Sequence, residues 1–188
     1  TTVSPTYARE LLRPEGAHGL DGVFRVAEYK FSGVLNGIDT EDYDPAKDAA
    51  ISPHYTAGRL TGKAKNKEKL QKRLGLSVRP DVPLIVMVSR LVSHKGLDLV
   101  CAVGDALLQG EVQLAVLGTG EWDYEQYFEG LLRRHPGYAA FYRGYDAQLA
   151  RQMYAGADLF LMPSRSEPCG LSQLIAMRYG AVPVVRET

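Results

Sequence analysis

Chemically versatile residues follow four apolar segments of the sequence, at the point where each segment ends. Ligands of open parallel α/β sheets bind outside the carboxyl ends of the strands, so these positions are the first candidates for a site. They offer two cations, a glycine turn, an aromatic ring, and a carboxylate beside a glycine that opens a helix. This combination is typical of a site for a sugar attached to a phosphate-bearing group. In chain order the residues are Arg90 and Lys95, then Gly118, Thr119 and Gly120, then Tyr145, and finally Glu167, Cys169 and Gly170.

Arg90, Lys95 and the helix that begins near Gly170 have the chemistry that a diphosphate needs. Arg90 can donate two hydrogen bonds to a phosphate, and Lys95 can supply a point charge. The helix contributes free N–H groups and the positive end of its dipole, and Gly170 lets a phosphate approach the backbone. The alternative for both cations is ion pairing at the surface, but their joint position after one strand favours ligand binding.

The other candidates are less specific. Glu167 can accept hydrogen bonds from sugar hydroxyls, or it can stabilise the start of the helix that follows it. The glycine turn at 118–120 is not a complete G-x-G-x-x-G motif. Tyr145 could stack on a nucleotide base or could simply pack. Cys169 could be reactive at a helix N-terminus, whereas Cys101 is expected to fill apolar space.

The elements that must position these residues alternate between apolar strands and amphipathic helices. The run LIVMVS at 84–89 is apolar almost throughout, as expected for a strand that is buried on both faces. This alternation predicts an α/β fold with a parallel, Rossmann-like sheet and helices on both faces. The expected strands are 84–89, 112–118, 139–144, 158–163 and 181–186, and the expected helices are 96–109, 121–134, 146–157 (with Asp146 as N-cap) and 170–180.

The first part of the chain has a less regular pattern. Its basic helix carries six cations, which we interpret as a solvated face. Both ends of the chain look cut, so we expect an excerpt of a longer protein. Strands are expected at 1–4 and 31–39, and helices at 4–12, with Ser4 as N-cap and Pro5 in the first turn, and at 60–76, closed by Gly75.

Composition and charge exclude several classes of protein. The 188 residues carry 22 Lys and Arg against 22 Asp and Glu, so nucleic acid and anionic membranes are not expected as main partners. No apolar run approaches the roughly 20 residues of a spanning helix, and we expect no signal peptide. Two cysteines are too few for a disulfide framework, which suits a reducing compartment. The four histidines are dispersed, and no zinc, serine-hydrolase or P-loop motif occurs, so no metal site is expected.

Six segments match a known family in sequence and in order. They are TVSPTYAREL at 2–11, GVLNGID at 33–39, NKEKLQKRLGL at 66–76, VSRLVSHKGLDL at 88–99, LGTGE at 117–121 and the segment 154–188, which contains PSRSEPCGL. Through them the chain resembles the glycogen synthase and starch synthase family of bacteria and plastids, and the resemblance extends over nearly its whole length. The family has the two-domain GT-B glycosyltransferase fold. The resemblance therefore implies that 1–32 is the tail of an N-terminal domain, 33–39 an inter-domain hinge, and 40–188 a donor-nucleotide-binding domain truncated at its C-terminal end.

The resemblance also implies an activity, which is transfer of glucose from ADP-glucose to the non-reducing end of an α-1,4-glucan. The family retains the configuration at the anomeric carbon and uses no metal and no cofactor. Arg90 and Lys95 would hold the donor diphosphate, and Glu167 would bind the hydroxyls of the donor glucose. Front-face displacement, in which the departing diphosphate takes the proton of the acceptor, would account for retention. The other donor-binding residues would be Asn36, Gly118, Thr119, Gly120, Tyr145 (near the adenine), Cys169, Gly170, Leu171 and Thr188.

The chain departs from the family pattern at several points. The N-terminal domain of the family, with a lysine–glycine–glycine loop and a catalytic histidine, is absent, so we expect the chain alone to be inactive. Ser166 replaces the usual aromatic residue, and Ile175 stands where related glycosyltransferases carry a second glutamate. The alternatives are another retaining GT-B glycosyltransferase and a non-catalytic module that binds nucleotide or glucan. A bacterial cytoplasm is favoured over the plastid stroma as the location.

Overall fold

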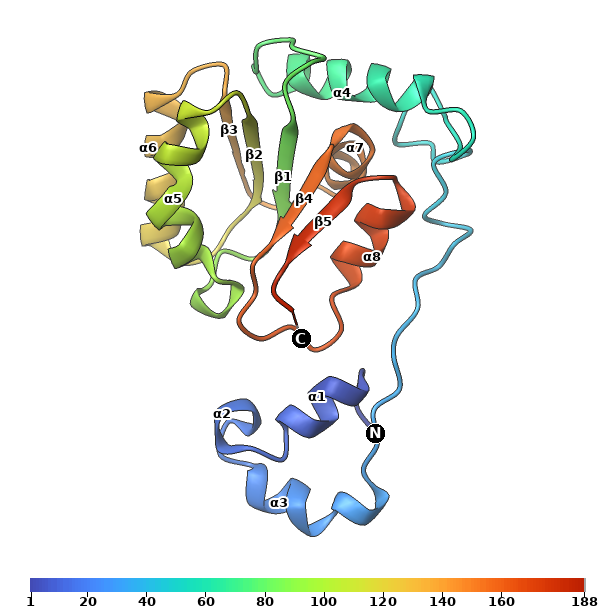
Figure 1. Cartoon of the computed structure of the whole chain (residues 1–188), viewed down its shortest axis with the longest axis vertical. Coiled ribbons are helices and arrows are strands. Elements are labelled where there is room, and N and C mark those ends of the chain that lie inside the picture. Colours follow the sequence, from blue (N-terminus) through green and yellow to red (C-terminus); the bar gives the residue numbers. More distant parts are fainter. Residues whose placement is uncertain (188) are drawn as a thin grey trace.

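The computed structural model describes residues 1–187 and has two parts (Figure 1). One part is a five-stranded sheet with helices on both faces, and the other is a small group of helices near the N-terminus. An extended segment joins them, and the carboxyl ends of the strands point toward the small group (Figure 1). That group consists of α1 (Pro5–Glu10), α2 (Pro14–Ala17), α3 (Asp21–Val26) and the 3-10 turn η1 (Glu28–Lys30).

The sheet is entirely parallel, and its strands lie in the order β3-β2-β1-β4-β5. β1 is therefore central, and the loops that follow its two neighbours flank the loop that follows β1. In the register of the sheet, Val86 lies beside Ala115 on one side and Phe160 on the other. The strands are β1 (Leu84–Val88), β2 (Gln113–Gly118), β3 (Ala139–Arg143), β4 (Leu159–Met162) and β5 (Val182–Val185).

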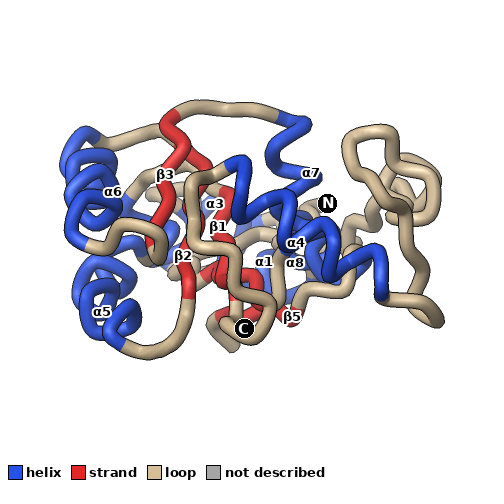
Figure 2. Tube along the Cα trace, turned by 90° about the horizontal axis from the view of Figure 1, so that it is seen from above, coloured by secondary structure: helices blue, strands red, loops and turns tan. Residues whose placement is uncertain are grey.

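Two layers of helices cover the sheet (Figure 2). Alternate residues of β1 point to opposite faces, so Val86 belongs to one hydrophobic core and Met87 to the other. A strand that is apolar at every position supplies both cores, which is why LIVMV forms the centre of this sheet. One layer holds α5 (Leu97–Gln109) and α6 (Trp122–Arg134), and the other holds α4 (Thr61–Arg73), α7 (Ala147–Gly156) and α8 (Leu171–Arg178); the 3-10 turn η2 (Ser93–Lys95) precedes α5.

The predicted alternation of strands and helices is confirmed. All nine elements expected between residues 84 and 186 occur in the expected order, with ends that differ by one or two residues. Both expected N-caps form: Ser4 Oγ accepts a hydrogen bond from the Tyr7 amide at 3.0 Å, and Asp146 Oδ1 accepts one from the Leu149 amide at 2.8 Å. The α/β class with a parallel, Rossmann-like sheet is thus established. None of the described helices combines the length and the apolarity needed to cross a membrane.

The two strands expected near the N-terminus are wrong. Residues 1–4 and 31–39 share a few backbone hydrogen bonds around one isolated bridge, between Thr2 and Gly33, and neither segment forms a strand. Pairing stops there because the chain turns into α1 at Pro5 and no longer runs beside the second segment. Gly33 lies so close to α1 that a Cβ atom on it would fall 1.9 Å from the carbonyl oxygen of Ser4.

The interpretation of the basic helix as a solvated face is wrong for two of its lysines. Lys63 Nζ donates to the carbonyls of Ala155 and Tyr179, at 3.1 and 3.0 Å, and so caps the C-terminal ends of α7 and α8. Lys67 Nζ donates to the Val82 carbonyl at 2.6 Å. Burial lowers the pKa of Lys63 to about 8. The remaining cations of α4, which are exposed, are Lys65, Lys69, Lys72 and Arg73.

Candidate functional site

Two adjoining cavities lie at the carboxyl edge of the sheet, and the candidate residues divide between them. The first cavity, which we call the cleft, has a volume of about 500 Å³ and is lined by β1, β2, α7 and the segments beside them. The second, which we call the pocket, has a volume of about 460 Å³ and lies between the loops after β1 and β4 and residues of the N-terminal part. Both volumes fall within the roughly 300–1,000 Å³ of small-molecule sites.

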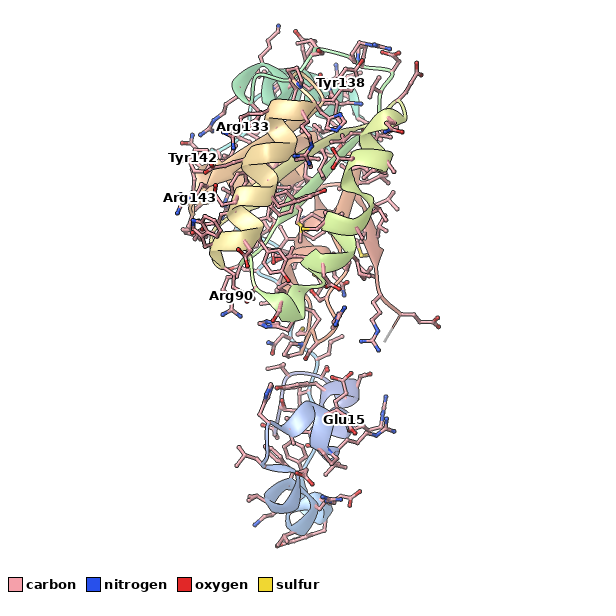
Figure 3. The ribbon with its side chains drawn as sticks, turned by 90° about the vertical axis from the view of Figure 1, so that its left-hand side faces the viewer. Glu15, Arg90, Arg133, Tyr138, Tyr142 and Arg143 are labelled. Atoms are coloured by element: carbon pink, nitrogen blue, oxygen red, sulfur yellow. The ribbon has the colours of Figure 1, made fainter. Side chains whose placement is uncertain are left out.

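Arg90 occupies the junction, because it lines both the cleft and the pocket. Figure 3 shows it at the end of the sheet that faces the N-terminal helices, whereas Arg133 lies toward the other end. Gly120 lines neither cavity, and Thr188 lies outside the described residues. Of the other predicted residues, Gly118, Thr119 and Tyr145 line the cleft, and Asn36, Lys95, Glu167, Cys169, Gly170 and Leu171 line the pocket.

Lys95 and Glu167 form a hydrogen-bonded ion pair at the wall of the pocket. Lys95 Nζ lies 2.7 Å from Glu167 Oε2, and the hydroxyl of Ser164 donates to the same oxygen at 2.9 Å. The two charged side chains are only 15% and 19% exposed. Glu167 does not cap α8, because Gly170 is the N-cap residue and no side chain caps that helix. The carboxylate is instead held in place by Lys95 and Ser164, and its Oε1 accepts from no protein donor among residues 1–187.

A close backbone contact brings the two members of this pair together. Gly96 has φ of +70°, and a Cβ atom on it would lie 2.1 Å from the carbonyl oxygen of Pro163. A glycine is required on both counts, since other residues rarely adopt this φ and none would fit. Nearby, the carbonyl of His94 accepts a hydrogen bond from the amide of Arg165 at 2.9 Å. The loop after β1 and the loop after β4 are therefore fixed against each other.

The glycines of the turn at 118–120 have a structural role. A Cβ atom on Gly118 would fall 2.1 Å from the carbonyl oxygen of Ser89, and one on Gly120 would fall 2.2 Å from that of Leu91. The turn thus lies directly against the chain that leaves β1, and a bridge joins Leu91 to Gly120. These contacts explain both glycines without a ligand.

Glu125 is a buried carboxylate that the sequence did not single out. It accepts hydrogen bonds from Thr119 Oγ1 at 2.6 Å and from the Gly120 amide at 2.9 Å, and it pairs with Arg143 at 2.6 Å. The hydrogen bond from Thr119, followed by that from Gly120, lowers the pKa of this carboxyl group. Its position in the first turn of α6, directly after a glycine turn, is the sequence signal that could have identified it.

Gly170 begins α8 in the left-handed conformation, with φ of +77°. The absence of a capping side chain leaves the first amides of this helix available to a ligand in the pocket. Cys169 lies 3.9 Å, measured from its Sγ, from the carbonyl oxygen of Asn36. Through this contact the N-terminal part of the chain reaches the loop that precedes α8.

The cleft also contains residues that sequence reasoning missed. Arg151 places its guanidinium 4.5 Å from the centre of the Tyr43 ring, and both residues line the cleft. Arg151 also donates to the carbonyl of Asp42 at 2.7 Å and lies 3.3 Å from the carboxylate of Asp48. The charge of Arg151 is therefore already neutralised by acidic groups. Tyr145, which also lines the cleft, is 84% exposed. No local pattern predicts that residues 42–48 fold back onto α7.

The part of the chain that the structure describes contains no group of three or more His, Cys, Asp or Glu side chains that could hold a metal ion. The four histidines are divided among three places. His18 and His94 line the pocket, His135 contacts Asp105, and His54 contacts the carbonyl of Asp48.

The comparisons with known proteins agree on one family. A model of the family described as glycosyl transferases group 1 matches residues 82–188. The glycogen synthase of Anaeromyxobacter dehalogenans is 53% identical over 99% of this chain. The glycogen synthase of Anoxybacillus flavithermus is 50% identical over the whole of this chain. The chain spans 39% of the length of each of these relatives.

Solved structures give the same result. The catalytic domain of starch synthase IV from Arabidopsis thaliana, bound to ADP and acarbose, matches all of this chain with a TM-score of 0.93 and 40% identity. The chain covers 39% of that structure. HepE of Anabaena in complex with UDP-glucose matches 87% of this chain with a TM-score of 0.60 and 25% identity, and 41% of it is covered.

Proposed function

Because the chain belongs to the group 1 glycosyl transferases, we propose that it is the nucleotide-sugar-binding part of a glycogen or starch synthase. The complete enzyme would transfer glucose from ADP-glucose to the non-reducing end of an α-1,4-glucan. One observation carries the proposal. Arg90 lies where the cleft meets the pocket, which is where the diphosphate of a nucleotide sugar must lie if its base occupies one cavity and its sugar the other.

The choice of an adenine nucleotide rests on the more similar structure. Starch synthase IV, at 40% identity, was solved with ADP, whereas the HepE structure at 25% identity contains UDP-glucose. In this chain the base would occupy the cleft, where Tyr43 and the exposed ring of Tyr145 offer faces for stacking.

The ion pair of Lys95 and Glu167 would change partners when the donor binds. Without ligand, each charge neutralises the other at 2.7 Å. A diphosphate would attract Lys95, and the glucose hydroxyls would donate to the carboxylate of Glu167. The pair therefore keeps two partly buried charges satisfied until the ligand supplies new partners for both.

Departure of the diphosphate would be favoured by positive potential from several sources. Arg90, Lys95 and the free amides at the start of α8 would all stabilise the negative charge that develops on it. We propose front-face displacement with retention, in which the diphosphate takes the proton of the acceptor hydroxyl. No metal and no cofactor enters this scheme, because the two cations and the amides at the start of α8 act on the leaving group directly.

A hinge between residues 33 and 39 is part of the proposal. The hydrogen bonds of this segment support a hinge at residues 37 and 38. Residues 32–36 are tied to residues 2 and 3, since Val34 N donates to the Thr2 carbonyl at 2.9 Å and Asn36 N to the Val3 carbonyl at 3.4 Å. Further on, the carboxylate of Asp39 caps the amides of residues 41 and 42. Rotation between residues 1–32 and residues 40–188 would then be concentrated at residues 37 and 38.

The glucan acceptor and the location in a bacterial cytoplasm are proposed on the same basis. The curated relatives are bacterial glycogen synthases, of which this chain spans 39%. Elongation would need the remaining part of such an enzyme to position the acceptor and to exclude water.

Calorimetric titration of the chain with ADP tests the proposal. We expect a dissociation constant between about 0.1 and 1 mM, which corresponds to a binding free energy of roughly 4–5.5 kcal/mol, because the half-open site leaves the contacts exposed to water. UDP should bind more weakly. Addition of ADP-glucose and a maltooligosaccharide to the chain alone should produce no elongation.

Two variants make this test specific. Arg90→Ala removes the cation at the junction, whereas Arg133→Ala makes the same change in charge on α6, toward the other end of the sheet (Figure 3). Only the first should lower the affinity for ADP. If ADP does not bind at saturating concentration, or if both variants behave alike, the assignment of the site is wrong; elongation by the chain alone would contradict the need for a second domain.

A further inference from the structure

The two cavities differ in which parts of the chain form them. Every residue that lines the cleft lies between Tyr43 and Ile175, that is, after residues 1–39. The pocket is also lined by Tyr7, His18 and Asn36, which belong to the N-terminal part. A ligand in the cleft therefore contacts only one part of the chain, whereas a ligand in the pocket is enclosed by both.

His18 is unusual among the residues of the pocket. It is the C-cap of α2 and adopts the left-handed conformation, with φ of 50° and ψ of 40°. Among residues 1–187 no other non-glycine residue has a positive φ. This conformation costs a residue with a Cβ roughly 1–2 kcal/mol, and Gly19, which follows, shows that glycine is used at the neighbouring position with φ of +85°. The sequence thus has a histidine where glycine would be easier to accommodate, and its side chain lines the pocket.

The chemistry of the pocket indicates what this histidine contacts. Cations for the diphosphate are present at Arg90 and Lys95, and Glu167 offers an acceptor for hydroxyls. An imidazole adds a group that can donate one hydrogen bond and accept another, which matches a sugar hydroxyl. We propose that His18 hydrogen-bonds a hydroxyl of the sugar held by Glu167, and that it thereby distinguishes a nucleotide sugar from the free nucleotide. This inference rests on the proposed function, because it takes the ligand to be a nucleotide sugar.

The division of the two cavities gives the inference a specific consequence. The base of the nucleotide would occupy the cleft, which contains no residue of the N-terminal part, and its diphosphate would be held by Arg90 and Lys95, so removal of the imidazole should leave the affinity for ADP unchanged. The affinity for ADP-glucose should fall. The informative quantity is the ratio of the two dissociation constants, measured on the same protein sample. A change of stability or folded fraction would alter both constants alike and would leave this ratio as it was.

Two substitutions keep the backbone of the turn intact. His18→Gly removes the side chain and relieves the strained conformation, and His18→Asn keeps a polar side chain in a residue type that tolerates positive φ. Glu15→Gln serves as the control, because Glu15 lies on the same short helix, α2, and lines neither cavity (Figure 3).

The experiment is calorimetric titration of the chain and its three variants with ADP and with ADP-glucose. For His18→Gly, the preference for ADP-glucose over ADP should fall about fivefold, the factor expected for one neutral hydrogen bond. His18→Asn should restore part of the preference, and Glu15→Gln should match the parent chain. An unchanged preference for ADP-glucose in His18→Gly would overturn the role of His18, and so would an equal loss of this preference in Glu15→Gln. In either case, binding of ADP by the parent chain would still support the site. Failure of the parent chain to bind ADP would overturn the proposed function and this inference together.

Discussion

Replacement of Glu167 by glutamine is expected to strengthen the binding of the nucleotide half of the donor and to weaken the binding of its sugar half. In the free chain, Lys95 Nζ is bound to Glu167 at 2.7 Å, so a diphosphate must compete with the carboxylate for this cation. Glu167→Gln removes the competing charge but keeps the shape of the side chain. ADP should therefore bind more tightly, while the preference for ADP-glucose over ADP should fall because a weaker acceptor faces the glucose hydroxyls.

The size of the effect follows from the burial of the pair. Two unit charges about 4 Å apart attract each other by about 1 kcal/mol in water and about 4 kcal/mol at an effective dielectric constant of 20. Measured contributions of exposed ion pairs to protein stability are only about 0.2–1 kcal/mol. Since these side chains are 15% and 19% exposed, we expect an intermediate value. Release of about 1–2 kcal/mol corresponds to an affinity for ADP that is about 5- to 30-fold higher.

Calorimetry at two salt concentrations measures this effect. The difference between the parent chain and Glu167→Gln should shrink at high salt, because the competition is electrostatic. Ser164→Ala is the matched control, since it removes the other hydrogen bond to Glu167 Oε2 and leaves both charges in place. Its affinity for ADP should stay close to that of the parent chain. Equal or weaker binding of ADP by Glu167→Gln would show that Lys95 does not hold the diphosphate.

Three further changes test other parts of the structure. Arg90→Ala in the full-length enzyme should reduce turnover about 100-fold or more, with little change in melting temperature, because it removes a contact that strengthens as the diphosphate leaves; normal turnover would rule out this role. Gly96→Ala should lower the free energy of unfolding by at least about 1–3 kcal/mol, since its Cβ would meet the Pro163 carbonyl at 2.1 Å, and thermal melting at parent-like temperature would contradict the contact. Burial lowers the pKa of Lys63 to about 8, against 10.5 for a free lysine, so the unfolded chain binds more protons between these values and the free energy of unfolding should rise with pH from 8 to 10. Denaturant titrations should show this rise for the parent chain but not for Lys63→Met, and equal slopes would refute the shift.

The sequence predicted that the residues that follow the strands would lie near one another, because the C-terminal ends of parallel strands lie at the same edge of a sheet. Arg90, Lys95 and Glu167 each follow an apolar run, and that rule alone brings them to the same edge of the sheet. The contact between Lys95 and Glu167 was not predictable in this way. It joins residues 72 positions apart and depends on the close contact of Gly96 with the loop after β4.

Other features depend on long-range contacts that no local pattern shows. The charge run of α4 has the usual composition of a solvated helix, but Lys63 meets the C-terminal carbonyls of two distant helices. Tyr43 lines the cleft in a segment that Arg151, on α7, binds through the Tyr43 ring and the Asp42 carbonyl. The strand expected at 31–39 failed for a similar reason, since a strand forms only where a partner continues beside it, and here α1 begins instead.

The way in which the loop after β1 is fixed limits how the proposed nucleotide specificity of this chain could be engineered. On one side, Glu121 Oε1 accepts a hydrogen bond from the amide of Ser93 at 3.0 Å, and Leu91 bridges Gly120. On the other side, Gly96 lies against Pro163. A loop transplanted alone from a relative with another nucleotide would lose its partners on both flanks. Chimeras that exchange the loops after β1, β2 and β4 as one block should fold and bind, whereas exchange of the middle loop alone should yield poorly folded protein.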